Sequence, residues 1–361
     1  MYAVSVVMPC HNRSFDLPRV LAAYEAQEGD LPFEVIAVDD GSTDATPGFL
    51  ASYRPSRFSL RVERLPKSQG PAAARNCGIA LAQAPILLFV GDDILPAPRL
   101  VQGHWEAHQT HPVREIAILG RVIWSPEIPV NALMKHIDGA GAQQFSYFFL
   151  KSGQEYDFRH FYTANISVKR TFLQQIDFWF DASFPYAAFE DAELAFRLAQ
   201  RGLRILYLDH LVGYHYHYHT VWSFANRQYK SGRAAWFLVK RHPAAAWKLF
   251  RVVHLRSLAQ AFLLRRGVTH EALRQLEEEL LHLASFYEWM PCPFIDLLFL
   301  PVMDYFYFKG ICAAALGDSV LALKAMSAYV ALWLRPRLRE FLRVACPQEA
   351  NSLMKLIEVG V

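Results

Sequence analysis

The chain has 361 residues, of which 53% are hydrophobic and 20% charged; this composition excludes a disordered protein and leaves room for two domains. Its 37 basic and 34 acidic side chains nearly balance at a formal charge of +3, which argues against nucleic acid as a partner. The five cysteines are odd in number, widely spaced and without a CxxC pair, so a disulfide framework and a zinc knuckle are disfavoured and a reducing compartment is expected.

The expected location is cytoplasmic. The N-terminal segment has no basic residue before its short apolar run, so it is a poor signal peptide and a better first strand. The sequence contains no run of about 18 uninterrupted apolar residues, so no membrane-spanning helix is predicted. The aromatic content of 14% is nevertheless high for a freely soluble enzyme, so peripheral contact with the inner face of the cytoplasmic membrane stays open.

The first hundred residues alternate short apolar runs with helical patterns. Strands are predicted over 3–8, 33–38, 59–65 and 86–90, and helices over 17–27, 46–53 and 72–83. This alternation predicts an α/β fold with a parallel sheet covered by helices. Ligands of such sheets bind beyond the carboxyl ends of the strands, where the polar clusters 9–13, 39–44 and 91–93 stand.

The middle of the chain mixes both kinds of element, and its last third is helical. Strands are predicted over 116–124, 161–168 and 204–208, with a helix over 189–201. From residue 222 nearly every pattern is helical, most clearly over 271–289. We therefore expect one domain over 1–236 and a helical region over 237–361. This region serves packing, dimerisation or membrane association.

Basic side chains are concentrated between residues 210 and 270, where no acidic side chain occurs. They are Arg227, Lys230, Arg233, Lys240, Arg241, Lys248, Arg251, Arg256, Arg265 and Arg266. After Lys240 they do not share one helical face, so the segment is not a simple amphipathic membrane helix. An anionic ligand or an acidic membrane surface is one interpretation, and a solvated helical bundle is the other.

Three acidic clusters could carry chemistry. Asp39 and Asp40 follow a predicted strand and suit a base N–H or a ribose hydroxyl, although an ordinary Asx turn has the same residues. Asp92 and Asp93 follow another strand and suit Mg²⁺ or Mn²⁺, the alternative being a solvated loop. Glu190-Asp191 begins a predicted helix, where the macrodipole favours carboxylates with or without a general-base role.

A run of alternating tyrosines and histidines covers residues 214–219. If it is a strand, its period of two places the three histidines on one face, where at least one could bind metal. An aromatic strand with hydrogen-bonded histidines is the alternative. The chain has no GxGxxG, GxxxxGK[ST] or GxSxG motif, which disfavours a dinucleotide oxidoreductase, a P-loop enzyme and a serine hydrolase.

The order of these motifs resembles a family 2 glycosyltransferase of the GT-A (Rossmann-like) fold. The matching stretches are 6–13, 38–44, 70–78, 89–93, 163–170 and 189–198, followed by His215-x-His217 and Gly232. The resemblance covers about residues 3–236, and its specificity comes from the order and spacing of six loose motifs. It implies a nucleotide-sugar donor, usually a UDP-sugar, and a divalent cation, Mn²⁺ or Mg²⁺.

The resemblance also implies roles for single residues. It places Pro9, Asn12, Asp39 and Asp40 around the nucleobase and ribose, with Arg75 toward the nucleotide. It places Asp92 near the ribose or the metal, and Asp93 on the metal together with His215 or His217. Asp191 is the implied general base, and Glu190 is its neighbour. Gly91 stands where many members have the first aspartate of a DxD motif. The Gln-x-x-Arg-Trp signature of processive synthases is absent, which disfavours a synthase that extrudes its product.

The expected function is therefore a metal-dependent inverting glycosyltransferase. Its acceptor is a hydroxyl of a saccharide, a lipid-linked glycan or another molecule, as in bacterial glycan or glycolipid synthesis. One alternative is a nucleotidyltransferase, which would release pyrophosphate. Another is a non-catalytic nucleotide-sugar binder or membrane scaffold, in which the helical region dominates.

Overall fold

The chain divides into two compact units. The structure is a computed structural model that describes residues 1–345 except 142, 146, 266 and 291, so Cys346 lies outside the described residues. The first unit contains Met1–Pro129 and Phe145–His217, and the second contains Val130–Gln144 and the chain from Tyr218 onward. The four cysteines that the structure describes are free thiols.

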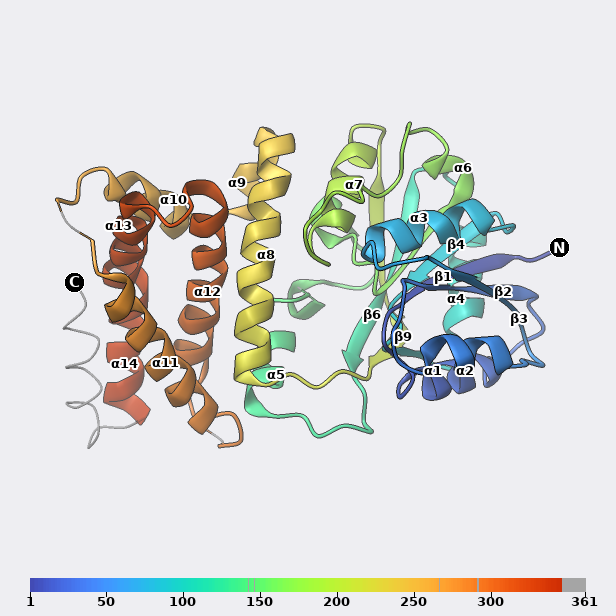
Figure 1. Cartoon of the computed structure of the whole chain (residues 1–361). Coiled ribbons are helices and arrows are strands. Elements are labelled where there is room, and N and C mark those ends of the chain that lie inside the picture. Colours follow the sequence, from blue (N-terminus) through green and yellow to red (C-terminus); the bar gives the residue numbers. More distant parts are fainter. Residues whose placement is uncertain (142, 146, 266, 291, 346–361) are drawn as a thin grey trace. The chain divides into compact units, whose positions relative to one another are not determined.

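The expected domain boundary after residue 236 lies inside helix α8 (Val221–Arg241), whereas the contacts divide the chain between residues 217 and 218. This helix lies along α12 (Asp296–Leu316) of the same unit (Figure 1). A Cβ added at Gly232 would lie 1.9 Å from the carbonyl oxygen of Tyr307, and one at Gly310 would lie 2.0 Å from that of Tyr229. The two backbones therefore touch through glycines, which makes α8 part of the helical unit.

The first unit is built on a mixed sheet. Strands β1 (Val4–Cys10), β2 (Phe33–Asp39), β3 (Ser59–Arg64) and β4 (Ile86–Val90) are parallel in the order β3-β2-β1-β4, which confirms the predicted parallel arrangement of the first hundred residues. The sheet continues as β8-β6-β9-β5, and β8 (Asn165–Lys169) runs antiparallel to β4.

Three features of the second half of this sheet differ from the sequence prediction. Strands β5 (Ile94–Pro96) and β7 (Glu155–Tyr156) are too short to show a periodic pattern and were not predicted. Strand β9 (Arg204–His215) continues seven residues past the predicted end at 208 and pairs in parallel with β6 (Ile116–Trp124) across a register shift.

Helices cover both faces of the sheet (Figure 1). Helices α1 (Leu17–Glu25) and α4 (Leu100–Thr110) pack on the face that carries Val4, Val6 and Met8. Helix α3 (Pro71–Leu81) packs on the opposite face, where a Cβ added at Gly78 would lie 2.5 Å from a methyl group of Val7. Both faces of β1 are therefore buried, as its mostly apolar sequence predicts.

A buried chain of hydrogen bonds joins α4 to β8. Lys169 Nζ donates to Nδ1 of His108 (3.0 Å), whose Nε2 donates to the hydroxyl of Ser167 (2.9 Å). That hydroxyl donates to Nδ1 of His104 (2.8 Å), whose Nε2 donates to Oδ1 of Asn165 (2.9 Å). Burial lowers the pKa of His104 to about 4 and that of His108 to about 3, so both rings are neutral.

The remaining helices of the first unit are α2 (Thr46–Ser52), α6 (Arg170–Leu173) and α7 (Glu190–Ala199). The second unit contains α5 (Ala132–Asp138), α8, α9 (Ala246–Leu249), α10 (Val252–Ala261), α11 (His270–Phe286), α12, α13 (Val320–Tyr329) and α14 (Arg335–Ala345). Its helical character from residue 222 onward confirms the prediction. Among the described residues, α12 is the one helix whose length and composition would suit a membrane span. Of its most apolar 18-residue stretch, 67% is buried inside the protein.

Candidate active site

The loops after β1 and β2 are joined to each other by hydrogen bonds. Asn12 has a left-handed backbone (φ 53°), its side-chain oxygen accepts from the backbone N–H of Thr43 (2.9 Å), and its own N–H donates to the hydroxyl of Ser42 (2.8 Å). Pro9, one residue inside the end of β1, pairs with Val38 of β2. The structure thus brings Pro9 and Asn12 to the end of the strand that carries Asp39.

Asp39 and Asp40 are both buried, and both are bonded to protein groups. Asp39 Oδ1 accepts from the backbone N–H of Ser42 (2.9 Å). This contact forms the Asx turn expected as the alternative to a ligand site. Oδ2 of Asp39 lies 3.3 Å from Nε of Arg64. The carboxylate of Asp40 accepts from the loop before α3: from the N–H groups of Gln69 (2.7 Å) and Gly70 (2.8 Å) and from the Ser68 hydroxyl (2.8 Å). In this structure Asp40 therefore holds that loop.

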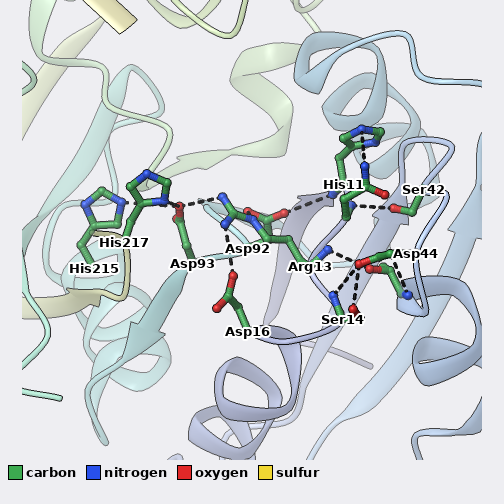
Figure 2. Close-up of polar contacts among 12 residues, drawn as sticks. His11, Arg13, Ser14, Asp16, Ser42, Asp44, Asp92, Asp93, His215 and His217 are labelled. Carbon is green, nitrogen blue, oxygen red and sulfur yellow. Dashed lines mark hydrogen bonds and ion pairs between the residues drawn. The ribbon is translucent and has the colours of Figure 1, made fainter. Parts of the chain in front are cut away.

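Arg13 lies between the two aspartates that follow β4 (Figure 2). Its Nε is 3.1 Å from Asp92 Oδ1 and its Nη2 is 3.1 Å from Asp93 Oδ2, while its Nη1 is 3.1 Å from Asp16 Oδ2. Arg13 ends the motif 6–13, for which no role of its cation is predicted. One feature of the sequence could have indicated this contact. Arg13 follows one strand and Asp92-Asp93 follows another, and the ends of parallel strands lie at the same edge of a sheet.

Asp93 also faces two histidines from the end of β9 (Figure 2). Strand β5 pairs Ile94 with His215, and the N–H of Tyr216 donates to the backbone oxygen of Asp93 (2.7 Å), so the two segments are held side by side. Asp93 Oδ2 lies 3.5 Å from His215 Nε2 and 3.6 Å from His217 Nδ1. The strand ends at His215, and His219 belongs to the second unit, so the predicted single face of three histidines does not form.

These three donor atoms fit a metal ion. Two ligand atoms that each lie about 2.1 Å from one ion, at tetrahedral or octahedral angles, are separated by roughly 3.0–3.4 Å. The carboxylate–imidazole distances of 3.5 and 3.6 Å exceed this by little, and all three atoms lie within 4.8 Å of one another. Imidazole and carboxylate are ligands that Mn²⁺ accepts. The ring of His215 stacks on Trp124, which limits its rotation.

The two neighbouring aspartates differ in their electrostatics. Burial raises the pKa of Asp92 and the charge of Asp93 raises it further, while Arg13 opposes both effects. Burial also acts to raise the pKa of Asp93, but the nearby His215, Arg13 and His217 outweigh it and hold that pKa below its ordinary value. Asp93 is therefore the member of the pair that carries a stable negative charge.

A second carboxylate pair begins α7. Phe189, the residue before it, has a left-handed backbone (φ 66°), which is strained for a residue with a side chain and turns the chain sharply into the helix. Glu190 Oε1 accepts from Arg75 Nη1 at 2.7 Å, and both side chains are less than 10% exposed. Arg75 was expected to face a nucleotide; here it pairs with Glu190 and packs over the ring of Phe180.

Asp191 lies at the same edge of the sheet as Asp92 and Asp93. Its Oδ2 is 3.4 Å from the hydroxyl of Thr163, two residues before the start of β8. Strand β8 begins with Asn165, which pairs with Val90, the last residue of β4. Burial raises the pKa values of both Glu190 and Asp191, and Arg75 only partly offsets this. A carboxylate with a raised pKa suits proton transfer.

Comparison with known proteins agrees with this geometry. Residues 5–176 match the model of "Glycosyl transferase family 2". The chain is 27% identical over 255 residues to "Uncharacterized glycosyltransferase YfnE" of Bacillus subtilis (strain 168), covering 58% of this chain and 64% of that protein. It is 30% identical over 225 residues to "Validoxylamine A glucosyltransferase" of Streptomyces hygroscopicus subsp. jinggangensis, covering 55% and 52%. The chain thus spans about half to two thirds of the length of these relatives.

The fold has matches among solved structures. Residues 1–349 of S. aureus TarS superpose with a TM-score of 0.51 at 19% identity, over 88% of this chain and 92% of that one. The complex of the same protein with UDP gives a TM-score of 0.50 at 18% identity, with the same coverage. At this identity the likeness establishes the fold. Residues 5–176 thus match glycosyl transferase family 2, and the fold is that of the GT-A structures.

Proposed function

We propose that this chain is an inverting glycosyltransferase that transfers a hexosyl group from a UDP-sugar to an acceptor hydroxyl and requires Mn²⁺ or Mg²⁺. The observation that carries this proposal is the presence of two carboxylate pairs at one sheet edge. Cationic groups lower the pKa of Asp93 in the first pair, and burial raises the pKa values of both members of the second pair. The hexosyl group is supported by the relatives' names, which include a glucosyltransferase and an N-acetylglucosaminyltransferase. The UDP donor is supported by the TarS complex.

The donor nucleotide is proposed to bind over the ends of β1 and β2. Asn12, Asp39 and Pro9 line this edge, and Asp40 orients the loop that leads into α3. Asp93, His215 and His217 would hold the cation, with Asp92 beside them. When bound, the cation supplies positive charge to the departing diphosphate. Arg13 already neutralises part of the charge of Asp92 and Asp93.

The proposed chemistry is a single displacement. Asp191 accepts the proton of the acceptor hydroxyl while that oxygen bonds to the anomeric carbon. The bond from this carbon to the diphosphate oxygen breaks, and its electron pair leaves with the nucleoside diphosphate. Because attack and departure occur on opposite faces of the sugar, the anomeric configuration inverts. Thr163 and the N-terminus of α7 hold Asp191 in place, and Glu190 with Arg75 forms the supporting ion pair.

The acceptor and the location are also proposals. Relatives named for poly(ribitol-phosphate) and succinoglycan support a saccharide or lipid-linked hydroxyl acceptor in bacterial glycan synthesis. A reducing, cytoplasmic compartment is supported by the free thiols of Cys10, Cys77, Cys292 and Cys312.

The test is nucleotide release from UDP-, GDP-, dTDP- and CDP-sugars, with Mn²⁺, with Mg²⁺ and with a chelator. We expect metal-dependent release of UDP from one donor, stimulated by a glycan acceptor. Release of pyrophosphate would instead identify a nucleotidyltransferase. Donor binding without release under any acceptor would support a non-catalytic binder and contradict the proposal.

A further inference from the structure

Helix α10 of the second unit has an unusual outward face. Its buried side chains are His254, Ser257 and Ala261, which face inward. The opposite side, which a soluble protein usually covers with polar groups, exposes Val252 by 64%. Directly after the helix, Phe262 and Leu263 are exposed by 72% and 82%, more than most apolar side chains of the chain. One short segment therefore exposes three apolar side chains, one at the start of α10 and two directly after its end.

The charged residues of this segment are all basic. Lys248 precedes the helix, Arg256 lies on its exposed side and Arg265 follows Phe262 and Leu263, and all three are exposed. No acidic residue occurs between 246 and 270. On α12, behind the helix, Asp304 is buried and bonded to His254 (3.0 Å) and Arg251 (3.2 Å).

The segment is firmly attached to the unit behind it. The ring of His254 stacks on Phe308 of α12, with centroids 5.1 Å apart, and its Nε2 bonds Asp304. Beyond the helix, the N–H of Val268 donates to the hydroxyl of Ser327 on α13 (2.9 Å). These contacts fix the segment to the second unit. Burying its exposed apolar side chains against a binding partner therefore costs little additional ordering entropy.

We propose that this basic apolar face, formed by Val252, Arg256, Phe262, Leu263 and Arg265, docks the protein on an anionic lipid bilayer. The phenylalanine and leucine side chains enter the boundary between head groups and acyl chains, and the basic side chains contact lipid phosphates. This combination of apolar and basic groups is typical of segments that lie in the membrane interface. Each basic side chain near an anionic surface contributes about 1 kcal/mol. The inference does not depend on the proposed enzymatic activity.

Vesicle flotation tests this directly on the full chain. We expect the protein to float with vesicles of phosphatidylcholine and phosphatidylglycerol, to float at least about tenfold less with phosphatidylcholine alone, and to be released by high salt. The double variant Phe262→Ser/Leu263→Ser is expected to lose flotation, and Arg256→Gln/Arg265→Gln to bind at least about tenfold less because two charges are removed.

A matched control is Phe148→Ser/Phe149→Ser, which removes another adjacent exposed pair, 63% and 59% exposed, in the first unit. We expect it to float like the parent chain. Thermal melting checks that each variant is folded. Flotation that is equal on neutral vesicles, absent, or lost in the control would overturn the proposal. Light scattering provides a further test. If the parent chain self-associates and Phe262→Ser/Leu263→Ser does not, the face binds a second copy of the chain and the proposal is overturned.

Discussion

The two carboxylate pairs of the first unit have similar sequences and different surroundings. Asp92 and Asp93 face Arg13 and two histidines, and the charge of Asp93 is stabilised. Glu190 and Asp191 share the single cation of Arg75, and Glu190 Oε2 has no hydrogen-bond partner in the part of the chain described.

This difference shows how one sheet edge can hold two kinds of acid. A carboxylate among cationic groups stays ionised and suits a metal ion, whereas one that is buried with few partners binds a proton more readily. The pKa of Asp93 is lowered and that of Asp191 is raised, although each follows another acidic residue in the sequence. Partners from distant segments, and not the local sequence, separate the two roles.

The largest effect is expected for Asp191→Asn, which removes the proposed base. Turnover should fall by a factor of about 10³ or more, because the amide accepts no proton, while UDP binding measured by calorimetry stays within about twofold. Asp177→Asn, at an exposed acidic position, is the control. If UDP binding fell as far as turnover, the base assignment would be wrong.

Asp93→Asn tests the other pair through its proposed ligand role. We expect Mn²⁺ affinity, followed by electron paramagnetic resonance, to fall by about a hundredfold, because the amide carries no charge. Asp16→Asn is a matched control, since Asp16 bonds the same Arg13 at 3.1 Å. Equal Mn²⁺ affinity in the parent and in Asp93→Asn would contradict the metal site.

Arg75→Gln tests whether this cation serves the second pair or a nucleotide. Arg75 lowers the pKa values of Glu190 and Asp191, so its loss should raise them and shift the acidic limb of the rate profile to higher pH. UDP affinity should be unchanged. Arg75→Lys keeps the charge and should restore the profile in part.

A loss of UDP affinity in Arg75→Gln without a change in the pH profile would return Arg75 to the nucleotide site. Because the pair is buried, breaking it is expected to cost about 3–5 kcal/mol of stability. Thermal melting of both variants is therefore needed before their kinetics are compared.

The smallest effect is on stability, where Asp93 and Asp191 should respond in opposite directions. The folded pKa of Asp191 is raised above its unfolded value, so its charge costs stability at neutral pH, and Asp191→Asn should raise the melting temperature. The folded pKa of Asp93 is lowered, so its charge contributes stability above about pH 4 that is lost on acidification, and Asp93→Asn should lower the melting temperature. Changes of a few degrees are expected at about pH 7.5 in calorimetry without metal. Shifts of the same sign would break the comparison.

Local patterns in the sequence predicted the first half of the sheet well. The strands that became β1, β2 and β4 are short apolar runs that stop at polar turns, because both of their faces are buried. The end of β9 was placed too early, since Asp209 and His210 interrupt its apolar pattern at the register shift opposite Gly120 and Arg121. A bulge disturbs the period of two, so the continuation to His215 is invisible without the partner strand.

The sequence by itself determined the α/β class, the strand ends that carry acidic residues, and the order of motifs shared with family 2 glycosyltransferases. These depend on neighbouring residues and on the period of each element. Only the tertiary structure decided that Arg13 joins Asp92 and Asp93, that Arg75 pairs with Glu190, and that α8 belongs with α12. Each of these contacts joins residues separated by more than 70 positions, and no local pattern records which distant groups meet when the sheet closes.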